Sequence, residues 1–236
     1  MKVFISVNDI SKKMSIRENF LKITLKYPIK ILGHIDFKRL FFVLFLLKRM
    51  LKEEIKMKNS LILYFSQTQN TEKVALAIKR GLEKNGVNVT IKKIGEMIEP
   101  DFNKYDLICF GSPVIHSLPP SPVLNMLKKY KEYYVNKNEV LVPSLKLPNK
   151  RALIFITYSG PHCGITEALP VGKYICQFFE HLGFHVLDEW YEIGEFHGWE
   201  EGSKKGIFGD IRGRPNDDDL ALVELKTIQL AKNYLY

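Results

Sequence analysis

Residues 58–86 have the sequence KNSLILYFSQTQNTEKVALAIKRGLEKNG, and this stretch decides the fold class. Residues 61–65 form an unbroken apolar run, which is typical of a parallel strand covered on both faces. Val74, Ile78 and Leu82 then recur at helical spacing and predict one buried helix face. The stretch therefore predicts a strand, a polar turn and a helix, which is the first βα unit of an α/β domain.

The same alternation continues along the chain. Apolar residues alternate at 87–91, as at the edge of a sheet, and further strands are predicted at 107–110, 152–156 and 184–193. Apolar residues at helical spacing predict the helices between them: Val123, Leu127, Tyr130 and Tyr134 in one, and Ala168, Val171, Ile175, Phe178 and Leu182 in the other.

A last helix is predicted near the carboxyl end. Asn216 is a favourable N-cap, and the aspartates 217–219 follow in the first turn of a helix that runs through Ala221, Leu225 and Ile228. Five βα units of this length predict an α/β fold, a three-layer, doubly wound sandwich around a five-stranded parallel sheet.

Positive charge is concentrated at the amino end of the chain. The formal net charge is +9, and residues 1–56 hold 13 Lys and Arg against 5 Asp and Glu, whereas residues 57–236 hold 22 against 21. A basic chain normally suggests nucleic acid, but the near-neutral composition of 57–236 excludes that partner for the main domain. We therefore expect a basic, apolar helical extension at 1–56 and a main domain at 57–236.

The extension leaves three interpretations open. Ser15 and Glu18 fit a capping box, and Asp36 is placed to cap a second helix through Lys56. Residues 40–47 are uninterruptedly apolar, far fewer than the roughly 20 needed to span a bilayer. The extension is either a helical hairpin packed on the main domain, sequence upstream of a start at Met57, or a helix at 36–56 in peripheral contact with an anionic membrane.

The cysteine and histidine patterns point away from disulfides and metals. Cys109, Cys163 and Cys176 show no CxxC or Cys/His spacing, which indicates a reducing, cytoplasmic setting. We expect Cys109 and Cys176 in the core and Cys163 as a bystander in a loop. His181 and His185 have the spacing of helical metal ligands, but we expect a helix-end residue and a strand residue.

The polar turn after the first strand predicts a phosphate site. Residues 66–71 offer hydroxyl and amide groups directly before a helix, whose amino end offers unpaired N–H groups and a positive dipole end. Ligands of open α/β sheets sit beyond the carboxyl ends of the strands, where this turn lies. The alternative is a plain helix cap.

The segment YFSQTQNTEKVA at 64–75 resembles the phosphate-binding loop of the flavodoxin-like family, whose pattern is a strand, S/T-x-T-x-N-T and a helix. Two further segments agree with it: GSPV at 111–114, expected after the third strand, and TYSG at 157–160, expected after the fourth. The resemblance covers about residues 58–236. It implies strand order 2-1-3-4-5 and FMN as cofactor.

The resemblance also implies the binding residues. Residues 66–71 would hold the phosphate, and residues 112–117 and 158–164 would flank the ring. The predicted cofactor-binding residues are Ser66, Gln67, Thr68, Gln69, Asn70, Thr71, Ser112, Pro113, Val114, Ile115, His116, Tyr158, Ser159, Gly160, His162 and Gly164. Many flavodoxins place a tryptophan against the ring, and neither ring-flanking segment here contains one.

A long glycine-rich stretch at 191–216 starts at the same sheet edge. Loops of this length are commonly lids or binding loops. Trp199 or His197 would then cover the flavin or substrate, and Arg212 or Arg214 would contact a phosphate or a partner. The alternative is a surface hairpin that leads into the last helix.

These features predict an FMN-binding flavodoxin-like protein in electron transfer, which cycles one or two electrons with a redox partner protein or NAD(P)H. The alternatives are an NAD(P)H-dependent quinone or FMN reductase and a non-catalytic binding module. The chain contains no GxSxG elbow, GxGxxG fingerprint or Walker lysine, and positions 66 and 111 lack the acidic residues of a phosphoacceptor domain.

Overall fold

The computed structural model describes residues 58–95 and 101–235. The predicted extension 1–56, with its capping box and its helix at 36–56, lies outside the described residues. Within those residues no helix is both long and apolar enough to cross a membrane.

Five strands of the described chain form one parallel sheet in the order β2-β1-β3-β4-β5. The strands are β1 (Asn59–Tyr64), β2 (Asn88–Lys93), β3 (Leu107–Pro113), β4 (Arg151–Tyr158) and β5 (His185–Ile193). The helices are α3 (Asn70–Glu83), α4 (Ser121–Asn136), α5 (Leu169–His181), α6 (Glu200–Lys205) and α7 (Asp217–Tyr234). Short 3₁₀ turns lie at η3 (Phe102–Lys104) and η4 (Gly164–Glu167). The predicted fold class and strand order are confirmed.

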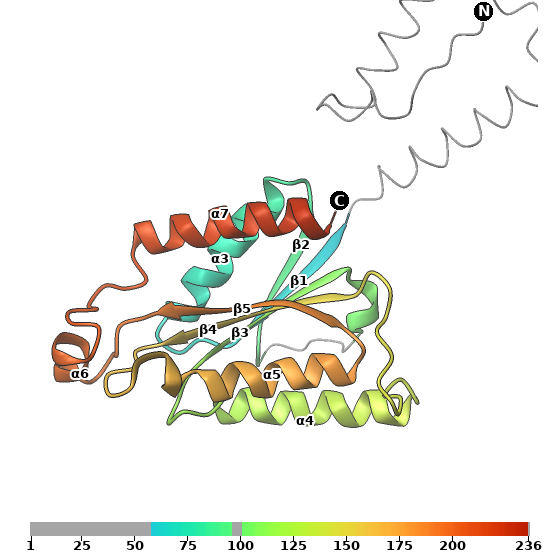
Figure 1. Ribbon diagram of the computed structural model, residues 1–236, viewed down its shortest axis with the longest axis horizontal. Helices are drawn as coiled ribbons and strands as arrows, with labels where there is room; N and C mark the ends of the chain where they lie inside the picture. Colours follow the sequence, from blue (N-terminus) through green and yellow to red (C-terminus); the bar gives the residue numbers. More distant parts are fainter. Residues whose placement is uncertain (1–57, 96–100, 236) are drawn as a thin grey trace, which may run out of the picture. The chain divides into compact units, whose positions relative to one another are not determined.

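Helices cover both faces of the sheet (Figure 1). On one side, α3 and α7 pack over apolar residues of β1 and β4, including Ile62 and Phe155. On the other, α4 and α5 cover a larger layer in which Phe102, Phe110 and Phe179 are fully buried. Because both faces are covered, the central strands are apolar along almost their whole length, as the sequence predicted.

Two strand ends extend beyond the predicted limits. Gly111, Ser112 and Pro113 were expected in a loop but belong to β3, and Thr157 and Tyr158 belong to β4. The reason is ladder pairing: Gly111 to Pro113 continue in register with β4 residues 155–157. The strands therefore carry these residues to the edge of the sheet.

The last helix is confirmed, but its buried face is formed by residues other than those that indicated it. Asn216 does cap α7, with a reciprocal bond from its backbone N–H to the Asp219 side chain. However, Ala221 and Leu225 are exposed, and the buried residues are Val223, Thr227, Leu230 and Ala231. The helix approaches α3 at Gly81, where an added Cβ would lie 2.6 Å from Thr227 Cβ. The close approach of α7 to α3 therefore depends on the small residues Gly81 and Thr227.

The cysteines and the paired histidines occupy the expected positions. Cys109 and Cys176 are buried, and burial raises the pKa of each thiol to about 12. Cys163 is exposed. His181 is the last residue of α5 and His185 the first of β5.

Candidate functional site

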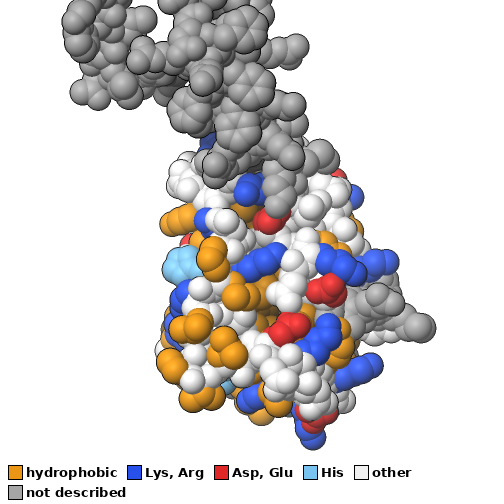
Figure 2. All heavy atoms as spheres, turned by 90° about the vertical axis from the view of Figure 1, so that its right-hand side faces the viewer, with side chains coloured by type: hydrophobic (Ala, Val, Ile, Leu, Met, Phe, Trp, Pro, Cys, Tyr) orange, Lys and Arg blue, Asp and Glu red, His pale blue; other side chains and the backbone are white. Residues whose placement is uncertain are grey.

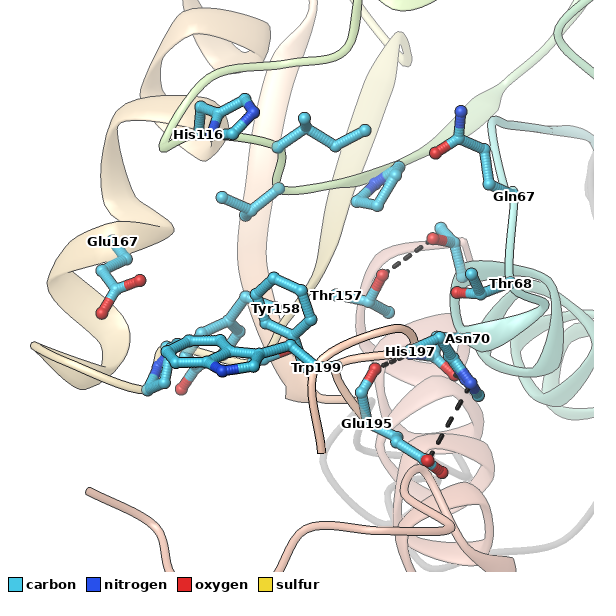
Figure 3. A pocket seen from close by; sticks show the side chains of 18 of the residues that line it. Gln67, Thr68, Asn70, His116, Thr157, Tyr158, Glu167, Glu195, His197 and Trp199 are labelled. Atoms are coloured by element: carbon cyan, nitrogen blue, oxygen red, sulfur yellow. Dashed lines mark hydrogen bonds and ion pairs between the residues drawn. The ribbon is translucent and has the colours of Figure 1, made fainter. Parts of the chain in front are cut away.

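The carboxyl ends of β1, β3 and β4 open onto a cavity of about 660 Å³ (Figure 3). Its wall is formed by residues 66–68, 70, 71, 113–117, 157–162, 167, 195–197 and 199. The position, beyond the carboxyl ends of the central strands, is where open α/β sheets bind ligands. The volume lies within the roughly 300–1,000 Å³ of small-molecule and cofactor pockets.

The turn between β1 and α3 forms one side of the cavity. Ser66 is only 4% exposed, and its Oγ has no hydrogen-bond partner. Gln69 precedes α3 in the left-handed conformation, with φ of 69°, and makes no side-chain cap. The Ser66 hydroxyl and the first N–H groups of α3 therefore remain available to a ligand at this side.

Asn70 and Thr71 are committed to the protein. Asn70 Nδ2 donates to the Glu195 carbonyl oxygen at 3.0 Å, and its Oδ1 lies 3.4 Å from His197 Nε2 (Figure 3). The Thr71 and Thr157 hydroxyls are 2.7 Å apart and buried. These contacts tie the turn to β4 and to the segment after β5. They position the turn rather than offer free donors.

A tight turn after β3 forms the second side. Ile115 and Leu118 exchange both backbone hydrogen bonds, each 3.0 Å long, around His116 and Ser117. Both central residues have positive φ, 50° and 58°, as a type I′ turn requires and as glycine and asparagine favour. Left-handed backbone costs other residues about 1–2 kcal/mol each. The strained turn places the His116 side chain on the cavity wall (Figure 3).

The loop after β4 forms the third side. The Gly164 N–H donates to the Gly160 carbonyl oxygen at 3.0 Å, which closes the loop on itself. Glu167 Oε1 accepts from the backbone N–H of His162 at 2.9 Å and of Cys163 at 2.6 Å. Glu167, the last residue of η4, therefore holds the loop in shape.

The segment after β5 supplies the fourth side and contains α6. Trp199 lies across the open space from His116 (Figure 3). Its indole packs against the His162 ring at a centroid distance of 5.7 Å and edge-on to Phe196 at 5.3 Å. A Cβ on Gly202 would lie 2.3 Å from the indole, so only glycine fits beneath it. The aromatic wall is thus fixed by its neighbours.

Solved structures with this arrangement of strands and helices include two flavodoxins and a flavodiiron core. The flavodoxin of Streptococcus pneumonia TIGR4 matches with a TM-score of 0.52 and 15% identity, over 74% of this chain and 99% of that one. The chain has a flavodoxin-like fold. Oxidised flavodoxin 1 from Bacillus cereus gives 0.51 and 15%, over 74% and 97% of the two chains.

The Flv1 flavodiiron core from Synechocystis sp. PCC6803 gives a TM-score of 0.51 and 19% identity, over 79% of this chain and 38% of that one. No family model and no curated protein matches the sequence. At these identities the likeness concerns the flavodoxin-like fold alone.

The cavity of this flavodoxin-like domain has no lysine or arginine among its described lining residues. Its ionisable side chains include His116, His162, His197, Glu167 and Glu195. Both arginines that the sequence placed near a ligand are paired elsewhere. Arg212 binds Asp210, with Nε to Oδ1 at 2.8 Å, and Arg214 binds Asp219, with Nε to Oδ2 at 2.9 Å.

The ion pair of Arg214 lies close to a cavity residue. The hydrogen bond from Arg214 holds the pKa of Asp219 below its ordinary value. Burial, together with the charge of Glu192, raises the pKa of the Tyr158 hydroxyl, which therefore stays neutral at physiological pH. Tyr158 is a buried neutral group, and its ring packs edge-to-face with that of Phe208 at a centroid distance of 6.0 Å.

The structure brings most of the sequence-predicted residues to the cavity wall of the flavodoxin-like domain. Three do not line it. Gln69 is exposed at the helix start, Ser112 is buried in β3, and Gly164 faces Phe208 behind the loop. Sequence reasoning missed Thr157, Glu167, Glu195 and Phe196, which line the cavity. Thr157 and Glu195 lie next to predicted strand ends, and that position could have indicated them. No signal in the sequence indicated Glu167 or Phe196.

Proposed function

We propose that this chain binds FMN in the cavity and takes part in electron transfer. The observation that carries the proposal is Ser66, a residue of the cavity wall whose hydroxyl is buried and has no hydrogen-bond partner in the protein. A buried polar group without a partner costs about 1–3 kcal/mol. A ligand that accepts its hydrogen bond, such as the FMN phosphate, explains why the hydroxyl is there.

The donor set around Ser66 fits a phosphate. Thr68 lines the same side of the cavity with an exposed side chain, and the amino end of α3 adds its N–H groups and dipole. These donors are all neutral. They favour a phosphate that is recognised by hydrogen bonds, as opposed to one that is neutralised by lysine.

The remaining walls fit a flat aromatic ring. Pro113, Val114 and Ile115 give an apolar surface on one side, and Trp199 gives an aromatic one on the other. These residues would hold the ring and exclude water from it, while the His116 and His162 imidazoles supply polar groups at the wall. When bound, FMN supplies one- or two-electron redox chemistry.

The cavity opening suits a redox partner protein. Exposed apolar side chains border it at Leu118, Ile165 and Ile207. Ile207 is held beside the cavity loop because its N–H donates to the Pro161 carbonyl oxygen at 3.0 Å. Exposed apolar groups around an opening are typical of protein interaction sites.

The test is a titration of the full chain with FMN and, separately, with riboflavin, followed by quenching of flavin fluorescence. Riboflavin lacks only the phosphate. We expect FMN to bind at least about tenfold more tightly, since hydrogen bonds to a charged group contribute roughly 1.5–3 kcal/mol. Equal dissociation constants, or no quenching by folded protein, would refute the proposal.

Anaerobic mixing of the FMN-loaded chain with NADH or NADPH separates the possible roles. An electron carrier keeps its flavin absorbance when NAD(P)H is the only reductant. Rapid bleaching by NAD(P)H alone indicates the quinone or FMN reductase. A folded chain that binds no FMN indicates the non-catalytic binding module.

A further inference from the structure

The α4–β4 loop (residues 137–150) is a fixed structure at the end of the sheet opposite the cavity (Figure 1). It is longer than the roughly 2–6 residues usual for such connections. Ser144 Oγ donates to the carbonyl oxygens of Glu180 at 2.7 Å and His181 at 3.1 Å, and Leu147 N–H donates to that of Gly183 at 2.8 Å. A Cβ on Gly183 would lie 2.4 Å from the Leu145 carbonyl oxygen, so the loop packs directly on the end of α5.

The loop turns its aliphatic side chains outward. Val142 is 99% exposed and Leu145 61%, and Leu141 and Leu147 are exposed as well. Figure 2 views the molecule from this end and shows hydrophobic side chains gathered on it beside lysine and arginine. A backbone that is held this firmly while its apolar side chains project into solvent indicates a surface that is covered in use.

Basic charge in the main domain is concentrated in the loop that carries these side chains and in the helix before it. Residues 121–150, which comprise α4 and the loop, hold six lysines and two glutamates, whereas the rest of 57–236 holds 16 basic and 19 acidic residues. Lys131 and Lys137 are exposed near the carboxyl end of α4. Lys137 lies 4.5 Å from the centre of the Tyr133 ring, which is an arrangement suited to a polar–apolar boundary.

We propose that the α4–β4 loop is a membrane-contact site, which inserts Val142 and Leu145 into an anionic lipid bilayer while Lys131 and Lys137 meet the headgroups. A bilayer is favoured over a protein partner because the tip projects outward. A side chain that is 99% exposed fits a deformable medium without needing a matching pocket. Lysines near exposed aliphatic groups match the surface potential of anionic lipid.

The loop leads into β4 at its amino end, and parallel strands begin at one edge of a sheet. The cavity, at the opposite edge, would then face away from the membrane. The proposal does not depend on FMN binding.

The test is co-sedimentation of the full chain with vesicles of phosphatidylcholine alone and of phosphatidylcholine with about 30% phosphatidylglycerol. We expect binding to the anionic vesicles, weakened about tenfold or more by Val142→Asp with Leu145→Asp. Lys131→Gln with Lys137→Gln should also weaken binding to the anionic vesicles. Added salt should reduce the difference in binding between the wild type and this lysine variant. Leu222→Asp on α7, at a residue 58% exposed, is the matched control and should leave binding unchanged.

Any of four results would overturn the proposal. The first is that the wild-type chain does not pellet with anionic vesicles, and the second is that it pellets equally with neutral vesicles. The third is that the variant with aspartate at positions 142 and 145 pellets as the wild type does. The fourth is concentration-dependent self-association that the loop substitutions abolish without any vesicle binding. Circular dichroism and the urea midpoint of each variant establish that it is folded, and the lysine variant tests the site without touching the aliphatic tip.

Discussion

Replacing Ser66 by alanine is expected to change stability and FMN affinity in opposite directions. In the free protein the Ser66 hydroxyl is buried without a partner, so its removal relieves a desolvation penalty. In the proposed FMN complex the same hydroxyl would donate to the phosphate, so its removal would cost a charged hydrogen bond. A residue that only shapes the turn would not show this reversal.

The burial of the Ser66 hydroxyl and its lack of a partner set the sign of both effects, and typical hydrogen-bond energies set their size. We take about 1 kcal/mol of stabilisation for the free variant, at the low end of the penalty for an unpaired buried group. Loss of a charged hydrogen bond of about 2 kcal/mol weakens FMN binding about 30-fold. At an FMN concentration about 100-fold above the wild-type dissociation constant, binding stabilises the wild type by about 2.7 kcal/mol and the variant by about 0.9. The variant should therefore be more stable without FMN and less stable with it, by roughly 1 kcal/mol each way.

The assay is urea unfolding of the full chain, followed by circular dichroism with and without FMN. Ser60→Ala is the matched control, because Ser60 is a fully buried serine of β1 that does not line the cavity. Its FMN affinity should equal that of the wild type. An alanine variant of Ser66 that is destabilised in the free state, or that keeps its FMN affinity, would refute the reasoning.

Three further outcomes are expected. Gly172→Ala should destabilise the fold in urea by about 1–2 kcal/mol, because its Cβ would lie 2.1 Å from the Tyr191 hydroxyl and overpacking outweighs the gain in helix propensity of about 1 kcal/mol; a stabilised variant would contradict this. FMN should quench the tryptophan emission of Trp190→Phe more than that of Trp199→Phe, because only Trp199 lines the cavity; equal quenching would place Trp199 away from the flavin. The pKa of Asp219 is held below its ordinary value by the hydrogen bond from Arg214. The charged Asp219 therefore contributes to the free energy of unfolding above about pH 4, and this contribution is lost as the pH falls through the lowered pKa. Asp219→Asn should therefore lower stability at about pH 7 by about 1 kcal/mol, with a difference that shrinks in acid unfolding titrations between about pH 5 and 2; a constant difference would contradict it.

The sheet could be predicted from sequence because both of its faces are buried. Runs such as 61–65 and 152–156 must be apolar throughout, and a short run of this kind between polar turns is typical of a central parallel strand. The face of α7 could not be predicted in this way. Its contact with α3 rests on Thr227 against Gly81, and neither residue contributes to a pattern of large apolar side chains.

The cavity was only partly predictable for a related reason. The turn at 66–71 is local, so its residue types and its place before a helix are visible in the sequence. Phe196 reaches the wall only through contacts between distant segments, such as the bond from Asn70 to the carbonyl oxygen of the neighbouring Glu195. Glu167 reaches it through bonds to the backbone of His162 and Cys163, which no pattern of residue types indicates. Likewise α6 could not be predicted, because its sequence, EEGSKK, contains no apolar residues at helical spacing.

The pairing of α3 with α7 has a consequence for how the protein is made. The apolar layer on that face includes Ile78 of α3 and Leu230 of α7, yet α7 follows β1 by about 150 residues. At a translation rate of about 5–20 residues per second, roughly 8–30 s pass between the synthesis of β1 and that of α7. During that time the α3 face is open while the opposite face, covered by α4 and α5, can already close. If translation stalls before Asp217, the nascent chain therefore exposes the apolar surface that α7 would cover. Exposed apolar surface of this kind is what chaperones bind.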